Sequence, residues 1–185
     1  MRAVLTNANE SLLEERRRLG IDHHDECWEG EWHLVNPPKR WHPRLQARLI
    51  VALAPLAEAA GLEPYGDSLG VFAASDDFRV PDLAFVHPAD GFDDGVRSAA
   101  LVIELRSPGD ESYQKLPFYA SRGIAEVLII HEDRRVELYR RRDDGELVQV
   151  ESEDGGVRSA VLGCTLHTTD GPALRISWPG GAADV

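Results

Sequence analysis

Two short apolar runs, about twenty residues apart, constrain the fold of this chain more than any other feature. Residues 99–105 read AALVIEL, and residues 126–132 read EVLIIHE. Nearly continuous apolar runs of this length are typical of strands that are buried on both faces of a sheet. The segment between them predicts a helix over about residues 111–121. The order strand, helix, strand predicts a parallel pair of strands with a right-handed crossover.

The segments on either side add a long helix and further strands. Leucines at three- and four-residue spacing predict an amphipathic helix over residues 43–60, which His42 directly precedes. A hairpin is expected over residues 24–38, and a strand after Pro81. Beyond residue 132, alternating segments separated by glycine-bearing turns predict a β-meander.

The chain of 185 residues is long enough for one domain with a proper core, which we place at residues 10–176. Residues 1–9 and 177–185 are expected to be loose. Cys27 and Cys164 show neither metal-site spacing nor disulfide density. No apolar run approaches the length of a signal core or a membrane span, so we expect a cytoplasmic protein without membrane contact.

Charge sets a limit on function. The formal net charge is −12, and an acidic balance disfavours a broad surface for coating nucleic acid. It does not exclude a small site at which metal ions offset the negative charge.

Three side chains in the central segment suggest chemistry. Asp82 opens one apolar strand, and Glu104 lies inside the next, where an unpaired charge is costly. Lys115 lies near the start of the following helix. Two carboxylates, with the main-chain carbonyl of Leu105 as a further oxygen ligand, suit a divalent cation such as Mg²⁺ or Mn²⁺ that keeps open positions. Such a cation polarises a phosphodiester and activates water, and a nearby lysine can offset developing charge.

Each of these residues also has a plain structural interpretation. An aspartate after a proline is commonly a strand-start residue. Glu104 could pair with Arg106, which lies two residues on and therefore on the same face of the strand. A lysine on a helix usually faces solvent. The three together, in this order and between these apolar runs, are more specific than any one alone.

The chain also resembles a known family. The string RVPDLAFV, followed by LVIELRSPGDESYQKLPFYASRGIAEVLII and then RRVELYR, resembles the putative restriction endonuclease domain family of bacteria. That family belongs to the PD-(D/E)XK nuclease superfamily, and the resemblance covers roughly residues 10–170. It implies an α/β (α+β) fold with a restriction-endonuclease-like mixed β-sheet flanked by helices. It also implies a Mg²⁺-dependent endonuclease that acts on DNA.

The resemblance assigns roles to individual residues. Asp82 and Glu104 correspond to the metal-binding acids. The superfamily's usual lysine position, two residues after the second acid, holds Arg106, so the resemblance places the lysine role on Lys115. Glu31 corresponds to an upstream acidic position and is a weaker third metal-site candidate.

Other positions of the motif receive lesser roles. Arg106 and His42 are candidates for binding substrate; an arginine cannot replace lysine cleanly, so Arg106 is expected to contact phosphate or Glu104. Tyr119 and Glu126 match the family pattern as packing and support.

Two other functions stay open from the sequence. The chain could be a catalytically inactive nuclease-like scaffold for protein interaction or assembly, which the acidic charge and Arg106 favour. It could also hydrolyse a small phosphorylated substrate. A homodimer is expected by analogy, because one site per chain needs a two-fold pair to cut both strands of a duplex.

Overall fold

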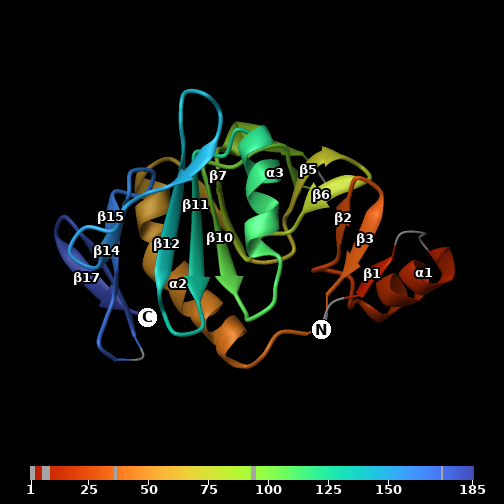
Figure 1. Cartoon of the computed structure of the whole chain (residues 1–185), viewed down its shortest axis with the longest axis horizontal. Helices are drawn as coiled ribbons and strands as arrows, with labels where there is room; N and C mark the ends of the chain where they lie inside the picture. The colour runs from red at the N-terminus through yellow and green to blue at the C-terminus, as the bar shows by residue number, and fades with distance from the viewer. Residues whose placement is uncertain (1–2, 6–8, 36, 93–94, 172) are drawn as a thin grey trace.

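The computed structural model describes residues 3–5, 9–35, 37–92, 95–171 and 173–185 (Figure 1). The helices of this part are α1 (Glu10–Leu19), α2 (Trp41–Ala59) and α3 (Leu116–Ser121), with short 3-10 helices η1 (Pro88–Asp90) and η2 (Ser112–Lys115). The strands up to the central segment are β1 (Ala3–Leu5), β2 (Glu26–Trp28), β3 (Glu31–Leu34), β4 (Glu63–Tyr65), β5 (Gly70–Ala74), β6 (Asp77–Arg79), β7 (Leu83–Val86), β8 (Gly91–Phe92) and β9 (Gly95–Val96). Those that follow are β10 (Leu101–Arg106), β11 (Glu126–His131), β12 (Val136–Arg141), β13 (Leu147–Gln149), β14 (Gly156–Ser159), β15 (Cys164–Thr168), β16 (Leu174–Trp178) and β17 (Gly181–Asp184).

The central sheet has the strand order β13-β12-β11-β10-β7-β4. Strands β10 and β11 are parallel, with Leu101 opposite Glu126 and Arg106 opposite His131. Strands β7 and β12 flank this pair in antiparallel orientation. The parallel pair predicted from the two apolar runs is therefore confirmed, inside a mixed sheet.

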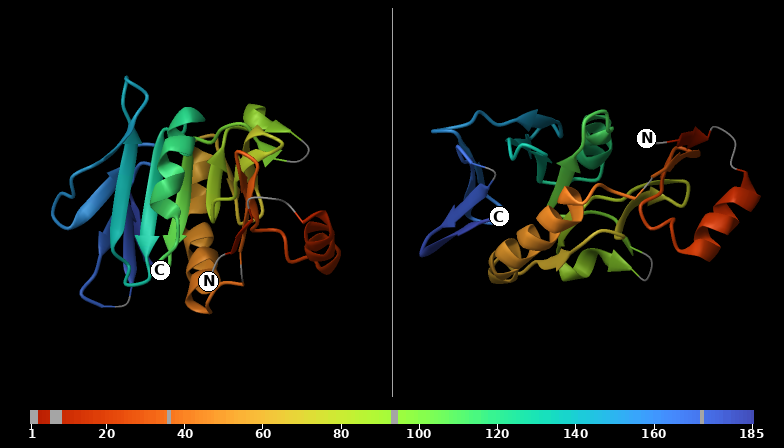
Figure 2. Two further views of the ribbon diagram at one scale, coloured as in Figure 1. Left: turned by 45° about the vertical axis from the view of Figure 1, so that its right-hand side comes forward. Right: turned by 90° about the horizontal axis from the view of Figure 1, so that it is seen from below.

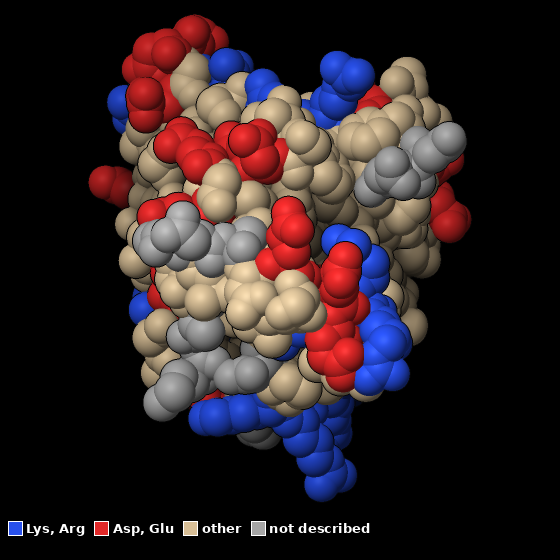
Figure 3. All heavy atoms as spheres, turned by 90° about the vertical axis from the view of Figure 1, so that its right-hand side faces the viewer, with Lys and Arg blue, Asp and Glu red and all other residues tan. Residues whose placement is uncertain are grey.

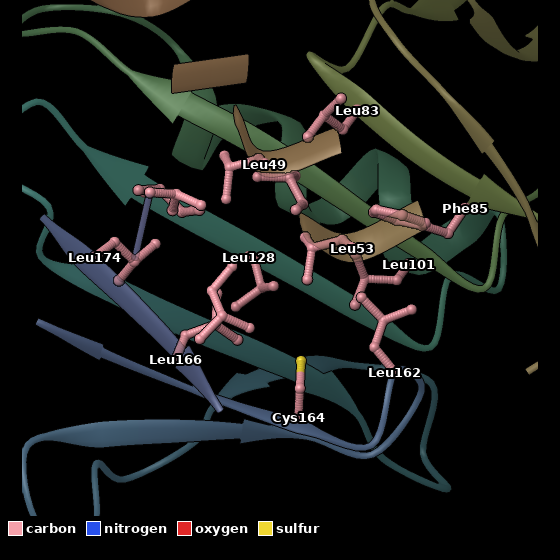
Figure 4. Close-up of a cluster of buried hydrophobic side chains, with 14 of the residues drawn as sticks. Leu49, Leu53, Leu83, Phe85, Leu101, Leu128, Leu162, Cys164, Leu166 and Leu174 are labelled. Atoms are coloured by element: carbon pink, nitrogen blue, oxygen red, sulfur yellow. The ribbon is translucent and has the colours of Figure 1, made fainter. Parts of the chain in front are cut away.

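The two faces of β10 pack against different layers, which explains why the run is apolar throughout. Leu101, Ile103 and Leu105 join a core cluster with the leucines of α2 and with the C-terminal strands (Figure 4). Val102 joins a second cluster that contains Phe118 and Tyr119 of α3. Glu104 shares the face of Val102, because side chains alternate along a strand. Its carboxylate therefore lies on the α3 side of the sheet.

Helix α2 covers the other face. Of the predicted leucine stripe, Leu45, Leu49 and Leu53 are buried and Leu56 is half-buried, and Ala57 is buried beside them. The helix begins at Trp41, two residues earlier than expected, so His42 lies inside its first turn. The predicted helix over residues 111–121 is divided into the 3-10 turn η2 and the short helix α3. Pro117 lies in the first turn of α3, where its missing N–H leaves no hydrogen bond broken.

A second sheet, with the order β1-β3-β2-β6-β5-β9-β8, lies beside the central one. The predicted hairpin forms β2 and β3, which pair so that Trp28 lies opposite Glu31 next to the turn. Strand β6 pairs with β2 at Cys27 and Phe78 and then leads directly into β7. This connection holds the open end of the hairpin beside the central sheet.

The C-terminal strands form a separate antiparallel sheet, β14-β15-β16-β17, that packs on the α2 face (Figure 2). The predicted meander is confirmed, but the expectation that residues 177–185 are loose is wrong. Residues 181–184 form β17 and pair with β16, and Val185 is buried. The small side chains of this segment carry no strand pattern, so its pairing with the neighbouring strand decides its structure. At the other end, Ala3–Leu5 pairs with β3, while residues 1–2 and 6–8 lie outside the described part.

None of the helices in the described ranges combines the length and the apolar character that a membrane span requires.

Candidate active site

A cavity of about 380 Å³ lies where five segments meet. They are the end of β10, the residues before β7, the first turn of α2, the 3-10 turn η2 and the open end of the β2–β3 hairpin. Asp82, Glu104 and Lys115, the three residues singled out from the sequence, all line it, and so does His42. The structure therefore brings together four side chains that span 73 positions of the sequence, from His42 to Lys115.

Asp82 is positioned by the end of strand pairing. The β7–β10 ladder stops at Leu83 opposite Ile103. Beyond it, the main-chain N–H of Leu105 donates to Oδ2 of Asp82 over 2.6 Å. On the other side, the Gln46 amide donates to the main-chain carbonyl of Asp82 over 2.7 Å. Oδ2 of Asp82 thus accepts a hydrogen bond from β10 just beyond the last ladder pair, and Oδ1 lies on the side of His42, in the cavity.

His42 contacts that second oxygen. Its Nε2 lies 3.1 Å from Oδ1 of Asp82. Burial lowers the pKa of His42, but the hydrogen bond to Asp82 and the charges of Asp82 and Glu104 outweigh it, so the net pKa is raised from its ordinary value. The contact with Asp82 thus favours the protonated imidazole, while Nδ1 is buried without a hydrogen-bond partner among the described residues.

Glu104 is buried and bound by donors. The Lys115 ammonium lies 3.0 Å from each carboxylate oxygen, and the Tyr119 hydroxyl donates to Oε1 over 2.5 Å. Burial raises the pKa of Glu104 to about 7, with contributions from Asp82 and Glu26, although Lys115 and Tyr119 act in the opposite direction. Burial also raises the pKa of Tyr119 well above its usual range, so its hydroxyl keeps the proton that it donates.

A third acid, Glu26, completes the cluster and was not singled out from the sequence. Its Oε1 lies 2.7 Å from the Lys115 ammonium and accepts a 3.0 Å bond from the Val80 amide. Its other oxygen accepts from the Trp28 indole over 2.8 Å. Lys115 therefore lies between two buried carboxylates. The only sequence signal was an acid at the start of a strand, and Asp25, Glu29 and Glu31 nearby gave competing choices.

Glu31, the predicted upstream acid, does not line the cavity. It is exposed and lies opposite Trp28, at the turn end of the hairpin. The open end of the hairpin faces the cavity, and Glu26 lies nearer that end. The expectation failed because the geometry of the hairpin, rather than sequence spacing, decides which acid reaches the site.

Arg106 is also directed elsewhere. Its Nε lies 3.8 Å from Oδ1 of Asp110, and its guanidinium carbon is 4.8 Å from the centre of the Tyr113 ring. It is absent from the residues that line the cavity. Stacking on Tyr113 and attraction to Asp110 hold the guanidinium there, and the ammonium beside Glu104 belongs to Lys115.

The oxygen donors of this cavity fit a hard divalent cation. Asp82 and Glu104 contribute carboxylates, and Leu105 directs its main-chain N–H toward Asp82. In an extended strand the N–H and C=O of one residue project to the same side, so the Leu105 carbonyl also faces the Asp82 side. Two carboxylates and a carbonyl are the ligand types that Mg²⁺ prefers. Within the described residues, however, no group of three or more His, Cys, Asp or Glu is arranged to hold a metal ion.

Comparisons with known proteins agree with this architecture. A family model described as Uma2, putative restriction endonuclease, matches residues 13–168. A similar solved structure is that of a putative nuclease belonging to DUF820 from Anabaena variabilis ATCC 29413. The identity is 16% and the TM-score 0.58, over 75% of this chain and 82% of that chain. At this identity the likeness shows the fold alone, and it confirms the predicted restriction-endonuclease-like fold class. No curated protein matches the chain.

Proposed function

This chain belongs to the Uma2 family of putative restriction endonucleases, and we propose that it is a Mg²⁺-dependent endonuclease that hydrolyses phosphodiester bonds of DNA. The observation that carries the proposal is the convergence of Asp82, Glu104 and Lys115 on one cavity. Burial and neighbouring carboxylates perturb the pKa of Glu104 there. Titratable groups with perturbed pKa values in a cleft are characteristic of catalytic sites.

The metal ligands in this proposal are Asp82, Glu104 and the main-chain carbonyl of Leu105. When bound, Mg²⁺ or Mn²⁺ would polarise the phosphate and supply an activated water molecule. The hydrogen bond from the Leu105 amide fixes one oxygen of Asp82, and a ligand held by a rigid element binds a cation more effectively than a mobile one.

Lys115 supplies the positive charge next to the scissile phosphate. Its ammonium is held between Glu104 and Glu26, so it is already oriented before substrate arrives. A preorganised cation stabilises the charge that develops in the transition state without reorganisation at the moment of reaction. His42 acts as a positioning residue, because its hydrogen bond holds Oδ1 of Asp82.

The test is cleavage of supercoiled plasmid and of single-stranded DNA in Mg²⁺ and in Mn²⁺. We expect cleavage by the unaltered protein and a loss of at least a hundredfold in Asp82→Asn and in Glu104→Gln, since removal of one group that stabilises the transition state typically costs that much. Lys115→Met tests the ammonium separately. Because this last variant loses a buried charge, its fold is checked by circular dichroism.

Glu31→Gln is the matched control. It removes a carboxylate of the same hairpin as Glu26 but lies outside the cavity, so cleavage should be unchanged. Activity that survives in Asp82→Asn and Glu104→Gln alike would contradict the proposal, since it would have to arise at another site or from a contaminant.

The alternative is a catalytically inactive scaffold that binds protein partners. The observations in its favour are the net charge of −12 and the arginine at position 106, where the superfamily places its lysine. A complete absence of cleavage under both metals, by a protein that is folded and monodisperse, would favour this alternative. A homodimer is part of the endonuclease proposal, and sedimentation velocity with and without duplex DNA tests it.

A further inference from the structure

A second hollow, separate from the active-site cavity, is lined by four arginines and has a volume of about 490 Å³. We call it the arginine groove and define it by Arg40, Arg44, Arg48 and Arg134. The first three recur every four residues and therefore form one stripe along α2. Arg134 comes from the turn between β11 and β12, and its guanidinium carbon lies 6.0 Å from the centre of the Trp41 ring.

Positive charge predominates in this groove, although the carboxylates of Glu132 and Asp133 act on Arg134 from nearby. No acidic side chain lines it within the described ranges, and none of its four arginines forms a side-chain ion pair with another described residue. Two of its arginines donate to main-chain carbonyls, Arg48 to that of Asp184 and Arg134 to that of Glu132. In a chain of net charge −12, such a concentration of cations is an exception that needs a reason.

The positive charges of the groove also oppose the stability of α2, the helix that carries three of them. Arg40 is the N-cap of α2, makes no side-chain capping bond, and the first turn contains no acidic residue. Cations at a helix N-terminus oppose the helix dipole, and like charges four residues apart repel each other. Burial lowers the pKa of Arg134, and repulsion from Arg44 and Arg48 contributes to this, although attraction to Glu132 and Asp133 acts in the opposite direction. Residues that break several local rules together are characteristic of functional sites.

The plain alternative is a solvated helix face, which would explain scattered arginines on an otherwise acidic surface. It does not explain why Arg134, from a different element, joins the same hollow. An anionic ligand satisfies all of these features at once, since it would neutralise the four charges and complement the dipole of α2.

The groove and the active-site cavity meet at the start of α2. Lys39 and His42 line the cavity, whereas the two residues between them, Arg40 and Trp41, line the groove. The helix begins at the lower edge of the molecule in Figure 1, and Lys and Arg atoms project from that lower edge in Figure 3. From Arg40 to Arg48 the helix rises about 12 Å, which matches three to four nucleotide steps of about 3.4 Å along one DNA strand.

We propose that the arginine groove binds the phosphate backbone of duplex DNA and guides it across the start of α2 into the active-site cavity. This inference rests on the proposed endonuclease function and adds the surface that holds the substrate. The groove makes sequence-independent contacts with phosphates, so it sets affinity and register rather than base preference.

The test is fluorescence anisotropy with a labelled 20-bp duplex, in buffer with a metal chelator so that no cleavage occurs, over 50–300 mM salt. In Arg44→Glu/Arg48→Glu we expect affinity at least tenfold lower than in the unaltered protein. The slope of log K against log salt should fall by about two, because each lost phosphate contact reduces it by about one. Both side chains are exposed, so this variant should fold, and its melting curve checks that.

Arg141→Glu/Arg142→Glu is the matched control. It changes the net charge equally, with two exposed arginines at the opposite end of β12. If both double variants lose affinity equally, or neither does, or if the unaltered protein does not bind the duplex, the inference is wrong.

Cleavage of plasmid in Mg²⁺ by the same variants separates this inference from the proposed function. If DNA binding depends on the groove but no cleavage occurs, the endonuclease proposal is wrong and the inference about the groove still holds. If Arg44→Glu/Arg48→Glu cleaves plasmid as well as the unaltered protein does, the inference about the groove is wrong and the endonuclease proposal still holds. The groove could instead hold the acidic surface of a second copy of the chain. If Arg44→Glu/Arg48→Glu changes the sedimenting mass but not the DNA affinity, the groove binds a second copy and the inference is wrong.

Discussion

At the scale of single residues, the central feature is Lys115 between Glu104 and Glu26. Both acids are buried, at 4% and 1% exposure, and the lysine is 6% exposed. A buried charge is stable only while its partners remain. One ammonium therefore balances two carboxylates that would otherwise repel each other, and this excess of negative charge is what a divalent cation can relieve.

The stability of the protein should depend on this lysine. Lys115→Met should lower the free energy of unfolding by about 3–5 kcal/mol, since it leaves two buried carboxylates without their cation. The double variant Glu104→Gln/Lys115→Met should recover part of the loss. Urea denaturation followed by circular dichroism measures both. Lys39→Met, at an exposed lysine, should change stability by less than about 0.5 kcal/mol, and a similar small effect at Lys115 would refute the buried cluster.

The raised pKa of Glu104 gives a pH dependence with a definite sign. Its pKa rises from an ordinary value of 4.5 to about 7 in the folded protein. Between these values the folded state holds a proton that the unfolded state has released, so the free energy of unfolding falls as pH rises through this window. At about 1.4 kcal/mol per pKa unit, the total fall is on the order of 3 kcal/mol.

Denaturation of the unaltered protein and of Glu104→Gln, in metal-free buffer from pH 4.5 to 7.5, isolates this contribution. The difference between the two curves cancels other titrating groups to first order. We expect the unaltered protein to lose stability relative to Glu104→Gln across the window. Parallel curves would show that Glu104 titrates in the ordinary range.

At the scale of elements, charged side chains also join the layers. The Glu126 carboxylate, at the start of β11, accepts from the Ser159 hydroxyl over 2.6 Å and from the Ala160 amide over 3.0 Å. The Arg140 guanidinium contacts it from β12. Glu126 therefore links the C-terminal sheet to the central sheet by hydrogen bonds, which agrees with the supporting role predicted for it.

Removal of this carboxylate should loosen the junction between the two sheets. Glu126→Ala leaves the buried Ser159 hydroxyl without its acceptor, which should cost about 1–3 kcal/mol of unfolding free energy. Glu132→Ala, at an exposed acid just after the same strand, is the control and should be nearly neutral. Chemical denaturation compares them. Equal effects in the two variants would mean that the junction depends on apolar packing alone.

At the scale of the whole molecule, the acidic balance restricts how DNA can be held. Most of the charged side chains are acidic, with 32 acidic against 20 basic residues. Long-range repulsion of DNA is therefore the default, and attraction must be local. In this proposal the attraction comes from the arginine groove and, once a divalent cation is bound, from the adjoining active-site cavity.

Metal binding should be visible in global stability, independently of catalysis. A ligand that binds only the folded state adds about 2.7 kcal/mol at a hundred times its Kd, and for a protein of this size each kcal/mol raises Tm by about 2–4 °C. Mg²⁺ at millimolar concentration should therefore raise Tm by several degrees over sodium chloride of equal ionic strength. Asp82→Asn/Glu104→Gln should abolish the difference. An equal rise in that variant would mean that the ion acts elsewhere on the acidic surface.

Local sequence pattern was enough to predict several parts of this protein. The apolar runs of β10 and β11 had to be buried strands, and the leucine stripe of α2 had to cover a sheet, because burial follows periodicity. Asp82, Glu104 and Lys115 were identifiable because charges stand out within or beside such runs. The C-terminal strand β17 had no such signal, since its small residues become a strand only through pairing with β16.

Which distant groups meet depends on how the chain folds in three dimensions. Glu26 rather than Glu31 reaches Lys115, because the open end of the hairpin faces the cavity. Arg106 stacks on Tyr113 instead of contacting Glu104, which was one of the two contacts expected for it. Arg134 joins the arginines of α2 through a turn that sequence spacing does not place. Each outcome depends on contacts between segments dozens of residues apart, and hydrophobic periodicity carries no information about those contacts.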